Sequence, residues 1–230
     1  LVEKPLHMKT SNLKEIYKIS KKNNTILYTA YNHRFEPHFK NAKNFLDNNS
    51  LGKFHFLKMF YGNGTSQLVK KSNWKDRKMG VISDLGSHLL DSIDFFLNIR
   101  PNNFNLVSKN YLENKSPDHA VFLHKTKSTL IHLEVSLCMW RNTFRCDLVF
   151  EKGSLHIDSL CKWGPSRLTI RKRIFPSGKP YEKNKVILSD DPTWNKEYKY
   201  FKSLIYKNQI LDVSKDLWIN EVLESFGKKN

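Results

Sequence analysis

Cysteine is scarce in this sequence. Cys138, Cys146 and Cys161 are the only three among 230 residues, and no two of them form a C-x-x-C pair. An odd and widely spaced set supplies neither a disulfide framework nor a zinc-binding signature. The composition therefore favours a reducing compartment, and we expect a cytoplasmic protein.

Long apolar runs are also missing. No stretch approaches the ~18–20 residues that a membrane-spanning helix requires, so we expect no membrane partner. The opening residues, LVEKPLHMKT, lack the basic-then-apolar layout of a signal peptide. They start without Met inside an apolar, strand-like stub, which predicts that the chain is a fragment. A hydrophobic content of 39% with 13% aromatics is typical of a folded protein.

Acidic residues are few relative to basic ones, and the formal net charge is +17. Such a charge raises nucleic acid as a partner. The lysines, however, are spread along the chain among many asparagines, and no nucleic-acid-binding signature accompanies them. The densest cluster, Arg171-Lys172-Arg173, lies beside a predicted strand, where basic side chains discourage edge pairing. We predict no nucleic-acid partner. A nucleic-acid-binding protein would instead have an affinity for nucleic acid that falls with salt, and its basic residues would gather on one face of the fold.

Residues 1–36 read as strand, helix, strand. A strand ends near Leu1-Val2, Ser11 or Asn12 can cap a helix, and residues 25–31 form a β-rich run suited to a buried strand. A unit of this length and order is what parallel sheets are built from.

The remaining residues, 37–230, predict a different architecture. Pro37 opens a helix that stops at Asn48-Asn49, and a strand follows over 53–61. Between 104 and 190 we expect four or five strands and no helix, with Lys152-Gly153 as a hairpin turn. Two helices near 193–207 and 214–227 close the chain. The fold class is thus a remnant of parallel α/β followed by a large, mostly antiparallel sheet packed on helices.

Asp84 and His88 form the strongest local constellation. Ser83 or Asp84 can cap a helix, and on that helix Asp84 and His88 lie one turn apart on the same edge. An imidazole near a carboxylate titrates close to neutrality, which suits a group that accepts and returns a proton. Gly86, between them, would let a ligand approach the backbone. The competing interpretation is a helix cap and a partly exposed histidine.

Two further segments follow predicted strands of the parallel piece. Lys4, in Glu3-Lys4-Pro5, would lie beyond the carboxyl end of a strand, where α/β proteins bind ligands. An amine there can bind a substrate hydroxyl and stabilise the negative charge that develops on its oxygen. The alternative interpretation is a surface lysine without a role in ligand binding. The segment 32–35, NHRF, emerges at the same sheet edge. It either donates hydrogen bonds to a ligand or ties down the crossover between domains.

Histidine gives no metal site. The nine are scattered, and the pairs His33/His38 and His119/His124 have no acidic or cysteine partners at ligand spacing.

In order and spacing, these motifs resemble the Gfo/Idh/MocA oxidoreductases. The sequence has Glu3-Lys4-Pro5, then 31–37 as YNHRFEP, then Trp74, then 84–91 as D-x-G-x-H-x-x-D. The later stretch from Trp140 through Gly153-Ser154-Leu155 to Trp194-x-x-Glu197 is similar to members found in surface-polysaccharide gene clusters.

The resemblance implies an N-terminally truncated NAD(P)-dependent enzyme that transfers hydride between nicotinamide and a sugar, nucleotide-sugar or polyol. Residues 1–36 would be the remnant of a dinucleotide-binding Rossmann domain, and 37–230 the C-terminal substrate and oligomerisation domain. It assigns the following roles: catalysis by Lys4, Asp84 and His88, cofactor binding by Glu3 and Lys4, and substrate binding by Asn32, Arg34 and Trp74. No metal is implied.

The resemblance also predicts a homo-oligomer formed through the C-terminal sheet. In the strand over 129–140, residues 131, 133, 135, 137 and 139 would face one way and the alternate residues a solvated or oligomer-forming side.

The sequence departs from the family pattern in two places. The glycine run before Asp84 is reduced to Met79-Gly80-Val81, so we expect a less open loop before the helix. No G-x-G-x-x-G occurs, and because that loop binds the pyrophosphate, we do not expect this polypeptide alone to bind NAD or NADP. The alternative function is a non-catalytic scaffold or sugar-binding module that keeps the C-terminal domain.

Overall fold

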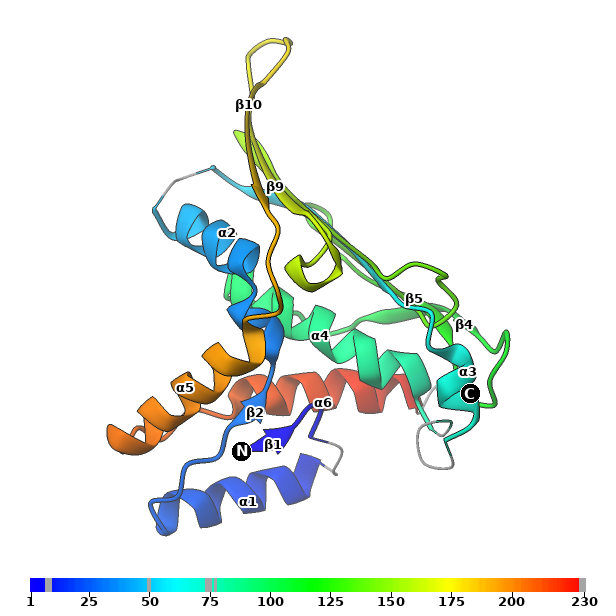
Figure 1. Ribbon diagram of the computed structural model, residues 1–230, viewed down its shortest axis with the longest axis vertical. Coiled ribbons are helices and arrows are strands. Elements are labelled where there is room, and N and C mark those ends of the chain that lie inside the picture. The colour runs from blue at the N-terminus through cyan, green and yellow to red at the C-terminus, as the bar shows by residue number, and fades with distance from the viewer. Residues whose placement is uncertain (7–9, 49–50, 73–75, 77, 228–230) are drawn as a thin grey trace.

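The computed structural model describes residues 1–6, 10–48, 51–72, 76 and 78–227. A large sheet forms one layer and helices cover one of its faces, while a small α/β unit lies against those helices (Figure 1). The predicted fold class, a small parallel piece followed by a large and mostly antiparallel sheet with helices, is confirmed.

The N-terminal unit is the predicted strand–helix–strand. Strand β1 (Val2–Glu3) pairs in parallel with β2 (Thr29–Ala30), and helix α1 (Thr10–Lys22) connects them. The second strand is much shorter than the β-rich run 25–31 suggests. Tyr28, just before this strand, and Ala30, within it, pack against Leu204.

The large sheet has eight strands in the order β10-β9-β8-β7-β3-β6-β5-β4. Its one parallel pair is β3 with β6; every other neighbouring pair is antiparallel. The strands are β3 (Phe54–Gly62), β4 (Asn105–Asn110), β5 (His119–Lys125), β6 (Leu130–Ser136), β7 (Thr143–Phe150), β8 (Gly153–Asp158), β9 (Ser166–Lys172) and β10 (Tyr181–Ile187).

The remaining elements are helical. They are the 3-10 turns η1 (Asn32–Phe35) and η2 (Cys161–Trp163), and the α-helices α2 (Pro37–Asn48), α3 (Ser66–Lys70), α4 (Gly80–Leu97), α5 (Thr193–Tyr206) and α6 (Ser214–Gly227).

Helix α4 is the centre of the molecule. It packs on β3, β5 and β6 with one side and on α6 with another, so it is buried nearly all round, its polar residues Asp91 and Asp94 included. Residues of β6 alternate as predicted: Ile131, Leu133 and Val135 are fully buried beneath the helices, whereas His132 and Glu134 are only half-buried on the other face.

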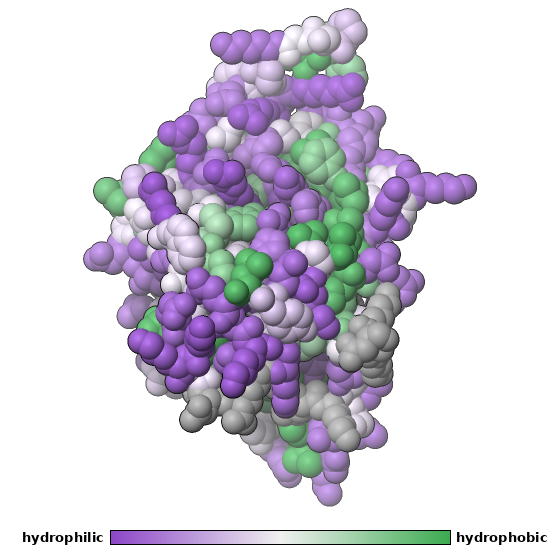
Figure 2. Space-filling view, turned by 90° about the vertical axis from the view of Figure 1, so that its right-hand side faces the viewer, coloured by the Kyte–Doolittle hydropathy of each residue, from purple (hydrophilic) through white to green (hydrophobic). Residues whose placement is uncertain are grey.

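The second face of the sheet carries no covering helix layer in the described residues (Figure 1). Viewed from that side, hydrophilic side chains predominate and apolar ones lie between them (Figure 2). No helix in the described parts of the chain has the length and apolarity needed to cross a bilayer.

Two local predictions about α4 are wrong. The helix begins at Gly80, so Asp84 lies in its second turn and is not the cap. Gly80 has a positive φ of 44°, and a Cβ there would come within 2.3 Å of the Pro117 carbonyl oxygen, so this start requires glycine. Gly86 does not open the backbone to a ligand, because its bare face packs against Phe122, 3.2 Å from where a Cβ would lie.

The strand count between 104 and 190 was also underestimated. Seven strands and the turn η2 occupy this region. Strand β10 was missed because six of its seven residues are exposed, so no alternation of apolar side chains marks it. The hairpin predicted at Lys152-Gly153 exists, with Glu151 and Lys152 as its two-residue loop.

Candidate active site

Lys4 reaches from the end of β1 to the second turn of α4. Its amine donates to the Asp84 carboxylate at 2.6 Å and to the Asp84 carbonyl oxygen at 2.8 Å. The lysine side chain is 13% exposed and that of Asp84 is 55% exposed, so the pair lies at the edge of the protein interior. The helix therefore fixes the amine in place through two acceptors on one residue.

His88 lies one turn further along α4, in a ring of aromatic side chains. Its imidazole stacks on that of His33, with ring centroids 4.1 Å apart and planes 21° from parallel. Tyr31 and Tyr61 approach it at 6.1 and 5.9 Å. Nδ1 of both histidines is buried without a hydrogen-bond partner among the described residues. Asp84 uses its carboxylate on Lys4, so ring packing is what holds the His88 imidazole.

Burial lowers the pKa of His88 well below its ordinary value, and the charges of Lys4, His33 and Lys162 lower it further. The pKa of His33 is likewise lowered, first by burial and then by Lys162 and Lys4. Both imidazoles are thus neutral near pH 7. A neutral imidazole has a free lone pair, so His88 can accept a proton from a bound hydroxyl.

Asn32 and Arg34, which the sequence suggested as substrate-binding residues, are engaged within the protein. The Asn32 amide donates to Thr193 Oγ1 at 2.9 Å. The Arg34 guanidinium donates to both carboxylate oxygens of Asp91, at 2.8 and 3.0 Å, and to Asp94 at 2.7 Å. These contacts favour the alternative role, in which the NHRF segment ties down the crossover between domains.

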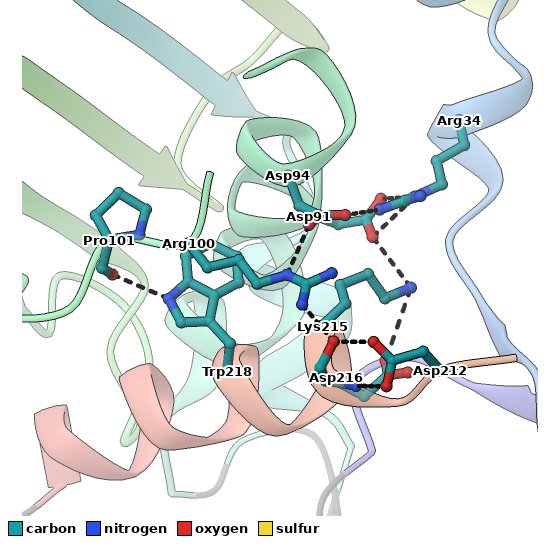
Figure 3. A network of polar contacts seen from close by, with 10 residues as sticks. Arg34, Asp91, Asp94, Arg100, Pro101, Asp212, Lys215, Asp216 and Trp218 are labelled. Atoms are coloured by element: carbon teal, nitrogen blue, oxygen red, sulfur yellow. Dashed lines mark hydrogen bonds and ion pairs between the residues drawn. The ribbon is translucent and has the colours of Figure 1, made fainter. Parts of the chain in front are cut away.

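Arg34 belongs to a network of charges that joins η1, α4 and α6 (Figure 3). Lys215 of α6 contacts Asp91 at 3.3 Å, and Arg100 contacts Asp94 at 2.8 Å. Asp91 is 1% exposed and Asp94 9% exposed, so these carboxylates are buried and need such partners. The network fixes η1, and hence His33, against the helix that carries His88.

The resemblance also assigns roles to Glu3 and Trp74. Glu3 is exposed on β1, and its charge is felt by Glu197 of α5. Trp74 lies outside the described residues. His33 lies within the NHRF segment that the sequence marks, between Asn32 and Arg34, and Tyr61 ends the strand predicted over 53–61. Neither residue carries an individual role in the prediction from sequence, because its packing against His88 depends on the fold.

The fold and the site together define a two-layer α+β domain that presents an amine, a carboxylate and an imidazole beside a small parallel sheet. The family model of the GFO/IDH/MocA C-terminal domain matches residues 39–156, about half of the chain. The chain belongs to this family.

Two curated proteins match over shorter segments. An uncharacterized oxidoreductase of Schizosaccharomyces pombe is 34% identical over 94 residues, which are 40% of this chain and 25% of the relative. Myo-inositol 2-dehydrogenase of Thermotoga maritima is 35% identical over 57 residues, 25% of this chain and 17% of the relative. The matched segments thus span a quarter or less of these relatives.

Levoglucosan dehydrogenase, solved in complex with NADH, has a similar structure. The TM-score is 0.79 at 15% identity, and the match covers 99% of this chain and 70% of that one. At this identity the likeness shows a shared fold.

Proposed function

We propose that the complete protein is an NAD(P)-dependent oxidoreductase that transfers hydride between a nicotinamide cofactor and a hydroxyl or carbonyl of a sugar, nucleotide-sugar or polyol. The observation that carries the proposal is the meeting of the Lys4 amine with the Asp84–His88 edge of α4 at the carboxyl end of β1. The names of the matching relatives, among them a myo-inositol 2-dehydrogenase and a levoglucosan dehydrogenase, support the substrate class.

In this proposal Lys4 binds the reacting oxygen. An ammonium group beside a hydroxyl stabilises the negative charge that develops on oxygen as its proton leaves. Asp84 positions the amine through the 2.6 Å ion pair. Because the Asp84 side chain is half-exposed, its second carboxylate oxygen is also available to a substrate hydroxyl.

His88 would move the proton. Its neutral imidazole accepts the hydroxyl proton during oxidation and returns it to the carbonyl oxygen during reduction. A lowered pKa keeps the accepting form dominant near pH 7 and makes the protonated form a strong acid. His33 and the two tyrosines restrict the imidazole to one orientation.

The residues present fit one end of the cofactor. Nicotinamide supplies hydride acceptance and donation when bound. Glu3 and Lys4, at the carboxyl end of β1, are the groups of this chain that would contact it. The 230 residues contain no G-x-G-x-x-G for a pyrophosphate, and the feature that separates NAD from NADP is not among them.

Three broader features belong to the same proposal. Residues 1–36 would complete a dinucleotide-binding domain and residues 37–230 would form the substrate domain.

The uncovered face of the sheet would be the contact surface of a homo-oligomer. Phe56 and Leu130 are apolar side chains on this face, and they remain 39% and 38% exposed. We propose a cytoplasmic location, because the three cysteines are unpaired.

The test is to produce the complete protein from its gene and measure two things. Calorimetry with NAD and NADP measures cofactor binding, and a panel of sugars, cyclic polyols and nucleotide-sugars is assayed for substrate-dependent formation of reduced nicotinamide. We expect binding of one cofactor and turnover of at least one panel member. Binding of neither cofactor would contradict the proposal and favour a non-catalytic, sugar-binding module.

A further inference from the structure

The turn η2 lies on the helix-covered side of the large sheet, between β8 and β9 (Figure 1). It is fastened to the segment that follows His33. The carboxylate of Glu36, 1% exposed, accepts hydrogen bonds from the Cys161 backbone at 2.8 Å and from the Cys161 thiol at 3.2 Å. The side chains that follow Cys161, those of Lys162 and Trp163, are therefore held on a fixed turn.

Trp163 faces the aromatic side chains that surround His88. Its indole lies 5.7 Å from the ring of Tyr61, which in turn lies 5.9 Å from His88. Both Lys162 and Trp163 are partly exposed, so they retain surface that a ligand can cover. The Lys162 amine lies 5.3 Å from the centroid of the Trp163 ring, and its charge lowers the pKa of both buried histidines.

An ion pair, supported by a series of hydrogen bonds, holds Lys162 from the other side. Its amine lies 3.8 Å from the carboxylate of Asp191. Asp191 accepts from the backbone N–H and the hydroxyl of Thr193, at 2.9 and 2.6 Å. Thr193 in turn accepts from Asn32. Asn32 thus positions the Lys162–Asp191 pair through Thr193.

The charges around this space cancel. Lys4 is paired with Asp84 and Lys162 with Asp191, while His33 and His88 are neutral. Each amine–carboxylate pair offers donors and acceptors together, the combination that adjacent hydroxyl groups require. A flat indole beside them offers an apolar surface to the C–H face of a saturated ring. Among the described residues around this space, an ionised substituent would find no uncompensated cation.

We propose that Lys162 and Trp163 form the substrate-recognising wall of the site, and that this wall selects an uncharged, polyhydroxylated ring over an acidic sugar or a nucleotide-sugar. The proposal rests on the proposed function and narrows its substrate class. In this arrangement Trp163 covers one face of the substrate ring, and the Lys162–Asp191 pair binds hydroxyls away from the reacting carbon. Lys4 and His88 contact the hydroxyl on the reacting carbon.

The experiment uses the complete protein and probes that differ in charge. D-glucose, D-galactose and myo-inositol are the neutral probes, D-glucuronate and UDP-glucose the anionic ones, and saturation-transfer NMR measures binding without turnover. The variants are Trp163→Ala and Lys162→Met. Trp140→Ala is the matched control, because Trp140 is 80% exposed on the turn after β6.

At least one neutral probe is expected to bind about tenfold tighter than either anion, and both variants to lose about tenfold in its affinity, with the control unchanged. Tighter binding of an anionic probe, unaltered affinity in Trp163→Ala, or binding of no neutral probe overturns the proposal. If a neutral probe binds in a way that depends on Trp163 but no hydride transfer occurs, only the proposed function is contradicted. If the protein turns over a substrate and both variants keep the wild-type KM, only the role of Lys162 and Trp163 is contradicted.

Discussion

His88 and Asp84 share one edge of α4, but they contact different partners. The carboxylate binds Lys4, and the imidazole packs on His33. The motif indicated that residues 84 and 88 would lie together, because helical spacing dictates it. The contact with His33 could not be read from the sequence, because it depends on how a turn 55 positions earlier docks on the helix. Local spacing predicts neighbours on one element; partners from other elements require the fold.

Lys4 gives the first prediction at this scale. In the complete protein, Lys4→Met should lower kcat about a hundredfold and raise KM, since it removes a donor aimed at the reacting oxygen. Steady-state kinetics measure both constants. Lys22→Met, an exposed residue at the end of α1, is the control. Wild-type kinetics in Lys4→Met would remove Lys4 from the mechanism.

The histidine stack gives a prediction about stability and pH. The pKa of each ring is lower in the folded chain than its ordinary ~6.5, so below that pH the unfolded chain binds more protons. The contribution of the two neutral histidines to the free energy of unfolding is fully present above about pH 6.5. It is lost as the pH falls, with a slope of up to about 1.4 kcal/mol per pH unit for each histidine.

His33→Phe keeps a flat ring in the stack but removes one titrating group. Urea unfolding at several pH values between 5 and 7 should give a smaller loss of stability in acid for this variant than for the wild-type chain. Identical slopes in the two proteins would show that His33 does not titrate with the low pKa assigned to it.

Among the elements, α5 is held on the N-terminal unit by a buried acid. Tyr28 beside β2 donates to Glu197 at 3.0 Å, and burial raises the pKa of Glu197 to about 7, with added contributions from Glu3 and Asp91. Sequence reasoning placed α5 correctly over 193–207, because its helical period is clear. It gave no partner for Glu197, since nothing local marks a contact with Tyr28, which lies 169 positions earlier.

Glu197→Gln tests this contact. A pKa raised from the usual ~4.3 means that the stabilising, protonated form is lost as the pH rises through about 7. Glutamine keeps an acceptor for Tyr28 and cannot ionise. The variant should equal the wild type near pH 4 and exceed its free energy of unfolding by roughly 2 kcal/mol at pH 8. If the free energies of unfolding of the two proteins differed by the same amount at every pH in this range, Glu197 would not titrate with the raised pKa assigned to it.

At the scale of the whole molecule, the charge network of Figure 3 links η1, α4 and α6. The large sheet and its helices could be predicted because alternating apolar positions recur along most strands. The network could not, because Arg34, Asp91 and Lys215 are ordinary polar residues in sequence. The interpretation of Arg34 as a substrate ligand came from its place in a motif. Its actual contacts are with buried carboxylates.

Arg34→Met should therefore destabilise the chain by about 3–5 kcal/mol, because it leaves the buried Asp91 and Asp94 with fewer partners. Lys43→Met breaks an ion pair with Asp47 whose lysine is 28% and aspartate 51% exposed, and should cost less than about 1 kcal/mol. Chemical denaturation of both variants measures the difference. Equal losses would show that the network adds nothing beyond a surface ion pair.

The central claim is that the ring at position 88 transfers a proton beside the amine of Lys4. The most direct test is the kinetics of His88→Ala in the complete protein, with cofactor affinity measured in the same preparation. The account predicts a fall in kcat of about 10²–10⁴-fold with the cofactor Kd unchanged within about twofold. An unchanged kcat across the pH range would contradict it.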